Sequence, residues 1–150
     1  MKFGRVVAVL VAVLVGLLGV VPAASAAPEQ WKLKSEWDSG MLDHNFTDGV
    51  HTRPSNAGPY QNWEVKRYAD GTYRFMNVAT KMCLDNSEHG VRGFGCNDGS
   101  WQRWRVNHWG NGTYEILSAW NNHCLDNSVY GVRTFGCNGL NHQRWTLWAP

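Results

Sequence analysis

The chain of 150 residues has the length of one domain with a sizeable core. It carries 14 Lys and Arg residues against 12 Asp and Glu residues, and two of the basic ones, Lys2 and Arg5, lie at the N-terminus. The rest of the chain is balanced in charge and offers no basic surface for nucleic acid, so we expect no nucleic-acid partner.

The N-terminus has the pattern of a secretory signal peptide, which we place over residues 1–26. Lys2 and Arg5 precede an uncharged apolar run at 6–21, and the small-x-small sequence "ASA" follows as a cleavage site. A membrane anchor is the alternative, but a spanning helix needs about 20 apolar residues. We therefore expect a secreted, extracellular domain over 27–150, with no membrane insertion after cleavage.

A repeat of 41 residues runs through that domain. Gln-x-Trp triplets begin at Gln61, Gln102 and Gln143, each after a Leu-Asp pair. The later copies, "CLDNSEHGVRGFGCNDGSWQRW" and "CLDNSVYGVRTFGCNGLNHQRW", agree closely. The first copy has drifted, carries one extra residue, and has Met41 and Ser55 where the others have cysteine. Such a period marks a repeat architecture, with repeats expected over about 30–70, 71–111 and 112–150.

Each repeat is expected to form short strands broken by turns. In the second repeat we expect strands at 72–78, 81–85, 90–96 and 101–109, followed by a turn at 110–112. Strands rich in Tyr, Phe, Val and Trp with Gly, Asn, Asp and Ser between them are typical of all-β proteins. Three repeats of about four strands predict a closed or nearly closed β structure. Closure would pair the first strand, in 30–37, with the last, in 143–150.

The four cysteines form one pair in each of the later repeats. Cys83 and Cys96 are 13 residues apart, as are Cys124 and Cys137. Export favours disulfides, and the repeat symmetry favours these two pairings among the three possible ones. Each bond would stabilise the fold by about 3 kcal/mol in the chain-entropy model. Zinc is the alternative, but no ligand spacing for it occurs, so we expect no metal and no cofactor.

Three copies of Leu-Asp, Gly-Val, Asn and Gln-x-Trp resemble the ricin-B-type β-trefoil lectins, also described as Gln-x-Trp carbohydrate-binding modules. The first copy, "LDHNFTDGVHTRPSNAGPYQNW", is especially similar to the actinohivin-like lectins. The resemblance covers nearly all of 27–150. It implies an all-β β-trefoil of three repeats with pseudo-threefold symmetry that binds glycans or polysaccharides. Because β-trefoils host unrelated functions, a module that binds or inhibits another protein is the alternative.

An aspartate in each repeat is the first candidate sugar ligand. Asp43, Asp85 and Asp126 follow Leu at a strand end, before a turn rich in Asn, Ser and Gly. The structural interpretation is an Asx-turn, in which the carboxylate bonds its own loop. The functional one is an acceptor-only group that takes charge-assisted hydrogen bonds from sugar hydroxyls. In the resembling families this Asp binds the sugar.

A sugar also has an apolar C–H face, so its site needs a planar or aromatic wall. Candidates in the third strand of each repeat are His51, Arg92, Phe94, Arg133 and Phe135. A second set, planar in every copy, precedes each Gln: Tyr60, Trp101 and His142. Three asparagines could bond the sugar beside the Asp, or only form turns: Asn56, Asn97 and Asn138.

The triplets themselves are expected to support the fold. A large side chain repeated three times indicates a core layer of Trp63, Trp104 and Trp145, each with a polar partner for its indole N–H. Each Gln is expected to bond loop backbone or the Asp of its repeat.

The candidate walls depart from the actinohivin-like pattern, which has Tyr where this chain has His51, Arg92 and Arg133. Mannose specificity is therefore not carried over, and the arginines could favour a charged or larger glycan.

An enzyme is not expected. The six histidines are scattered without a catalytic motif, and threefold symmetry argues against one asymmetric catalytic centre. A single shallow sugar site binds weakly, whereas up to three linked sites give avidity. We therefore expect a non-catalytic, monomeric lectin.

Overall fold

The computed structural model describes residues 27–148, so the expected signal peptide lies outside the described residues. In this range each repeat supplies four strands. The first repeat has β1 (Gln30–Ser35), β2 (Met41–Asn45), β3 (Gly49–Arg53) and β4 (Trp63–Arg67). The second has β5 (Tyr73–Asn77), β6 (Met82–Ser87), β7 (Gly90–Gly95) and β8 (Trp104–Gly110). The third has β9 (Thr113–Ser118), β10 (Cys124–Ser128), β11 (Gly131–Phe135) and β12 (Trp145–Trp148).

Six strands close into a barrel. Around the ring β1 pairs with β4, β4 with β5, β5 with β8, β8 with β9, β9 with β12, and β12 again with β1, all antiparallel. The expected pairing of the first strand with the last is confirmed, with Leu33 opposite Leu147. No helix among residues 27–148 is long and apolar enough to cross a membrane.

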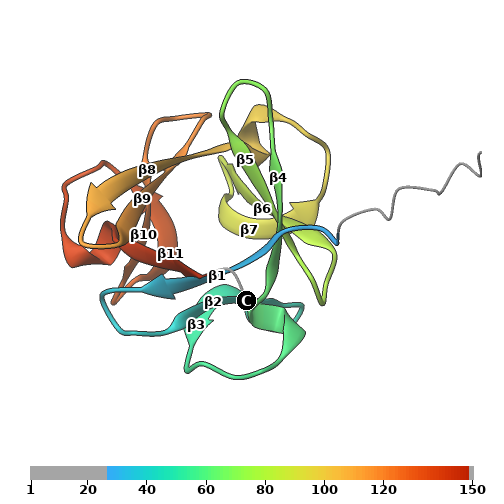
Figure 1. Ribbon diagram of the computed structural model, residues 1–150, viewed down its shortest axis with the longest axis horizontal. Helices are drawn as coiled ribbons and strands as arrows, with labels where there is room; N and C mark the ends of the chain where they lie inside the picture. The colour runs from blue at the N-terminus through green and yellow to red at the C-terminus, as the bar shows by residue number, and fades with distance from the viewer. Residues whose placement is uncertain (1–26, 149–150) are drawn as a thin grey trace, which may run out of the picture.

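The other six strands form three hairpins, β2–β3, β6–β7 and β10–β11, one from each repeat. Figure 1 shows the resulting three lobes around a common centre, with β1–β3 below, β4–β7 at the upper right and β8–β11 at the left. A six-stranded barrel with three hairpins is the β-trefoil architecture, so the expected fold is confirmed.

The core centres on the repeated tryptophans. Trp63, Trp104 and Trp145 are completely buried. Their indole N–H groups donate to the backbone carbonyls of Leu42, Leu84 and Leu125 at 3.0, 2.9 and 2.9 Å. Each bond joins the strand that begins at the tryptophan to the strand that carries Leu-Asp. It also gives the buried indole N–H an acceptor, without which its burial would cost free energy. The predicted core layer is confirmed.

The expected strand at 101–109 begins later than predicted. Ser100–Gln102 forms a short 3-10 turn, and β8 starts at Trp104. Gln102 is buried and bonds back to the loop before it, which requires a compact turn rather than an extended chain. The predicted turn at 110–112 is present, and Asn111 and Gly112 adopt positive φ angles of 50° and 74° there.

The three hairpins contact one another through an equivalent pair at each junction. Two junctions join an Asn to a Thr hydroxyl: Thr134 Oγ1 to Asn86 Oδ1 at 2.9 Å, and Thr52 Oγ1 to Asn127 Oδ1 at 3.4 Å. At the third, His44 replaces Asn and Gly93 replaces Thr, and a Cβ added to Gly93 would overlap the His44 ring. The larger imidazole thus fills the space that the missing side chain leaves.

Gly93→Thr alone should destabilise the fold by about 1–3 kcal/mol, because its side chain overpacks against His44. Combined with His44→Asn, it should restore the pair found at the other junctions and recover most of that loss. Urea unfolding of the wild type, both single variants and the double variant measures the coupling, expected at about 1–3 kcal/mol. Additive single effects would contradict this account.

His44 should also make stability depend on pH. Burial lowers its pKa below the ordinary value of 6.5, so the unfolded chain takes up a proton before the folded one. The contribution of neutral, buried His44 to the free energy of unfolding is complete above about pH 6.5. It is lost as the pH falls through the pKa of His44 in the folded protein. The melting temperature should therefore drop between pH 7 and 5, by less in His44→Asn than in the wild type. Equal drops in both would exclude His44 as the cause.

Candidate functional site

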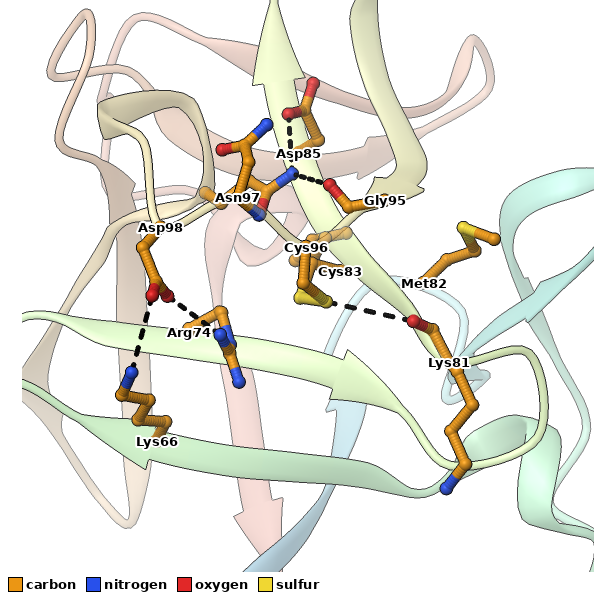
Figure 2. Close-up of a disulfide and its surroundings, with 12 residues drawn as sticks. Lys66, Arg74, Lys81, Met82, Cys83, Asp85, Gly95, Cys96, Asn97 and Asp98 are labelled. Atoms are coloured by element: carbon orange, nitrogen blue, oxygen red, sulfur yellow. Dashed lines mark hydrogen bonds and ion pairs between the residues drawn. A yellow bond between two sulfur atoms is a disulfide. The ribbon is translucent and has the colours of Figure 1, made fainter.

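A buried glutamine organises the loop beside each hairpin. In the second repeat Gln102 donates from Nε2 to the Gly95 carbonyl at 2.9 Å and to Asp85 Oδ2 at 3.2 Å. Its Oε1 accepts from the backbone N–H of Asn97 at 2.9 Å. Figure 2 shows Asp85 and Gly95 near the Cys83–Cys96 bond, with dashed lines for the hydrogen bonds that they accept.

The other repeats largely reproduce this arrangement. Gln143 bonds Gly136, Asp126 and Asn138 at 3.0, 3.3 and 2.8 Å. In the first repeat Gln61 bonds the Pro54 carbonyl and the Asn56 amide. The predicted supporting role of the glutamines is confirmed.

The three aspartates lie under a cationic or imidazole side chain. Asp85 Oδ1 accepts from Arg92 Nε at 3.1 Å, and Asp126 Oδ1 from Arg133 Nε at 3.1 Å. These are directly opposite residues of the β6–β7 and β10–β11 hairpins. The aspartate side chains are at most 5% exposed, as is that of Asp43 under His51. Asp85 and Asp126 therefore anchor the arginines above them, which the Asx-turn interpretation does not describe.

The arginines in turn lie against aromatic rings. The guanidinium carbon of Arg133 is 4.7 Å from the centre of the Phe135 ring and 4.9 Å from that of Tyr130. Arg92 lies 4.3 Å from the Phe94 ring. Such contacts are favourable cation–π interactions and fix the guanidinium plane. The Arg92 and Arg133 side chains are 32% and 36% exposed, and their hydrogen bonds to the described residues are made through Nε.

The asparagines shape the loop. Asn56, Asn97 and Asn138 accept backbone N–H bonds on Oδ1 from the residue two positions on, at 2.7, 2.9 and 3.0 Å. This is the Asx-turn that was one of their two interpretations. The same residues are exposed, and the amide NH₂ of each has no acceptor among the described residues.

The third repeat brings all of its predicted site residues around one hollow. A cavity of about 240 Å³ is lined by Asp126, Arg133, Phe135, Asn138 and His142. Its rim adds Tyr130 and Leu140, exposed by 77% and 55%. Sequence reasoning missed these two, although an exposed aromatic in the hairpin turn "SVYG" and an apolar residue after "CNG" were visible signals.

The first and second repeats share parts of this arrangement. In the second, Phe94 and Trp101 are exposed by 45% and 41%. In the first, Tyr60 is exposed by 47%, but no ring stands at the position of Phe94. Arg53 occupies that position, donating to His51 Nε2 and to Asp48, each at 2.6 Å. The three candidate sites therefore differ in chemistry.

A separate aromatic cavity lies in the barrel. It measures about 330 Å³ and is lined by the equivalent residue of each repeat, Trp31, Tyr73 and Tyr114, with Val106 and Leu147. None of the predicted site residues lines it.

Both expected disulfides are confirmed. Cys83–Cys96 and Cys124–Cys137 have Cα separations of 5.1 Å. Glu115 lies close to the second pair, but sulfurs bonded to each other are not available as metal ligands. In the first repeat Met41, only 2% exposed, occupies the equivalent buried position.

The comparisons with known proteins agree with this fold. Residues 23–95 match the family described as ricin-type beta-trefoil lectin domain-like, which confirms the resemblance drawn from the repeats. The narrower likeness of the first repeat to actinohivin-like lectins stays a prediction. No curated protein matches the sequence of this chain.

Solved structures share the architecture at low sequence identity. The designed threefold-symmetric protein ThreeFoil has a TM-score of 0.73 at 23% identity, over 79% of this chain and 96% of that chain. The Macrolepiota procera ricin B-like lectin, solved with lactose, has a TM-score of 0.70 at 16% identity. The match covers 85% of this chain and 99% of that chain. An exo-beta-1,3-galactanase from Clostridium thermocellum has 0.76 at 18%, over 83% of this chain but only 31% of that chain. At these identities the likeness shows the fold alone.

Replacing Cys83 by Met and Cys96 by Ser gives the second repeat the residues of the first. The variant should remain folded, because the Gln102 and Trp104 bonds persist, but lose about 2–4 kcal/mol of unfolding free energy with the disulfide. Thermal unfolding followed by circular dichroism measures this. A variant without native signal at 20 °C, or with unchanged stability, would contradict the independence of the loop bonds from the disulfide.

Proposed function

We propose that this protein is a secreted, non-catalytic lectin whose third repeat forms its best-developed sugar site. The observation that carries the proposal is the cavity that gathers Asp126, Arg133, Phe135, Asn138 and His142. The match to the ricin-type lectin-like family supports it.

The chemistry of this cavity suits a sugar ring. Phe135 and Tyr130 both contact the Arg133 guanidinium and remain 49% and 77% exposed, so each leaves apolar ring surface against which sugar C–H groups can pack. The NH₂ groups of Arg133 and Asn138 are donors for hydroxyl oxygens. Each oxygen of Asp126 has two lone pairs and uses one within the protein, so the carboxylate can still accept a hydroxyl hydrogen.

The aspartate thereby has two roles in the proposal. It fixes Arg133 through Nε, and it lies on the wall of the cavity as an acceptor. A donor and an acceptor held next to each other match the adjacent hydroxyls of a pyranose, whose every O–H can both donate and accept. Charge-assisted bonds of this kind discriminate between hydroxyl orientations.

The second repeat offers a related site at Arg92, Phe94, Asn97 and Trp101, where the completely buried Asp85 acts by holding Arg92. The first offers a more polar one at Asp43, His51, Asn56 and Tyr60. Each site is shallow, so single-sugar affinities are expected on the order of millimolar. Binding of two or three sites to one clustered glycan raises the effective concentration of each further contact. Polysaccharides and glycoproteins are therefore the proposed partners.

A glycan array and a polysaccharide pull-down test this function. The wild type should bind a defined set of glycans, and Asp126→Asn and Phe135→Ala should each weaken the binding about tenfold, through a lost charged hydrogen bond or a lost apolar face. Binding should survive EDTA, because the proposed contacts involve no metal.

Trp148→Ala is the matched control, because it removes an exposed ring that lines none of the cavities described above. It should bind like the wild type. A wild type that binds no glycan, or site variants that bind as well as the control, would contradict the lectin function. Capture of a protein by the wild type and both site variants alike would favour the protein-binding alternative.

A further inference from the structure

A second hollow adjoins the cavity of the third repeat. It measures about 390 Å³ and is lined by Trp37, Gly139, Leu140, Asn141, His142 and Arg144. Leu140 and His142 line both hollows, so the two are neighbours that share these side chains. Neither the Leu-Asp pattern nor the family match points to this second hollow, because Trp37 comes from another repeat.

Trp37 is held in place rather than free. Its ring stacks on His142, with centroids 4.0 Å apart and planes inclined by 28°. Its backbone N–H donates to Ser35 Oγ at 3.2 Å, and the neighbouring Glu36 N–H donates to the Arg144 carbonyl at 3.0 Å. Trp37 is nevertheless 45% exposed. The indole thus offers a fixed apolar surface beside the sugar cavity.

Arg144 also lines this hollow, whose surface is mainly apolar. Its Nη2 donates to the Gly139 carbonyl at 2.8 Å, and its guanidinium carbon lies 4.9 Å from the centre of the Trp109 ring. No acidic side chain forms a salt bridge with it among the described residues, although Glu115 lies near enough to interact with its charge. A fixed aromatic surface next to a positioned donor is the combination that binds a pyranose ring.

We propose that the third site takes at least two consecutive sugar residues. One lies in the cavity of Asp126 and Arg133, and the next lies over the Trp37–His142 pair; the inference rests on the lectin function proposed above. The volumes agree with it. The second hollow, of about 390 Å³, is at least as large as the first, of about 240 Å³, so each has room for one sugar ring.

The repeats differ at the position of Trp37. Its equivalents are Ala79 and Trp120, in "NVAT" and "SAWN" against "SEWD". All three segments contact the triplet of a neighbouring repeat through the same backbone hydrogen bond, to the carbonyls of Arg144, Asn62 and Arg103. The aromatic surface beside the third site is therefore repeated beside the second, and it is missing beside the first. Extended binding should follow this difference.

Isothermal titration with matched sugars tests the inference. The probes are galactose, glucose, mannose and N-acetylglucosamine, each against its own disaccharide: galactobiose, cellobiose, mannobiose and diacetylchitobiose. The protein is the Asp43→Asn/Asp85→Asn variant, in which the third site is left intact. The preferred disaccharide should bind about tenfold tighter than its monosaccharide, and Trp37→Ala should remove that gain while Trp37→Phe retains most of it.

The outcomes separate the two proposals. If the glycan array finds no ligand and none of the eight sugars binds, the lectin function fails and the inference fails with it. If monosaccharide and disaccharide bind equally, or if Trp37→Ala keeps the tenfold gain, the extended site is wrong and the lectin function stands. If Trp37→Ala weakens both sugars equally, Trp37 acts by positioning His142 and the second subsite is also wrong. Trp148→Ala, as control, should keep the gain.

Discussion

The structure depends on one hydrogen bond made three times, from the indole of a buried tryptophan to the carbonyl of the leucine before each aspartate. This bond fixes where the Leu-Asp strand lies against the barrel. In the second and third repeats, the buried glutamine two residues before the tryptophan then ties the loop to that same strand. A Gln-x-Trp triplet thus determines both the core and the shape of the neighbouring site, which is why the two repeat together.

The candidate sites begin where this shared framework ends. Buried residues are nearly constant among the repeats, with Trp, Gln and Asp in the same places. The exposed residues above the aspartates vary, from His51 with Arg53 to arginines on phenylalanines. Because the buried residues stabilise the fold, the exposed residues can differ from repeat to repeat. The three repeats therefore present three different candidate binding surfaces.

Much of this was predictable from the sequence, because the repeat is a physical constraint visible in the residue spacing. The barrel closure, the tryptophan core and the disulfides follow from the 41-residue period. The burial of Asp126 under Arg133 was not predicted, although the register of a hairpin pairs residues on opposite strands. The contact of Trp37 with His142 joins residues more than 100 positions apart. No local pattern indicates which side chains meet across such a junction, nor that His44 requires Gly93.

A crystal structure of the protein with its preferred disaccharide tests the central claim most directly. The account predicts one sugar ring beside Phe135 and Tyr130, with hydroxyls bonded to Arg133 and Asp126, and the second ring over Trp37. A disaccharide bound only in the barrel cavity of Trp31, Tyr73 and Tyr114 would contradict it, because none of the aspartates would then take part in recognition.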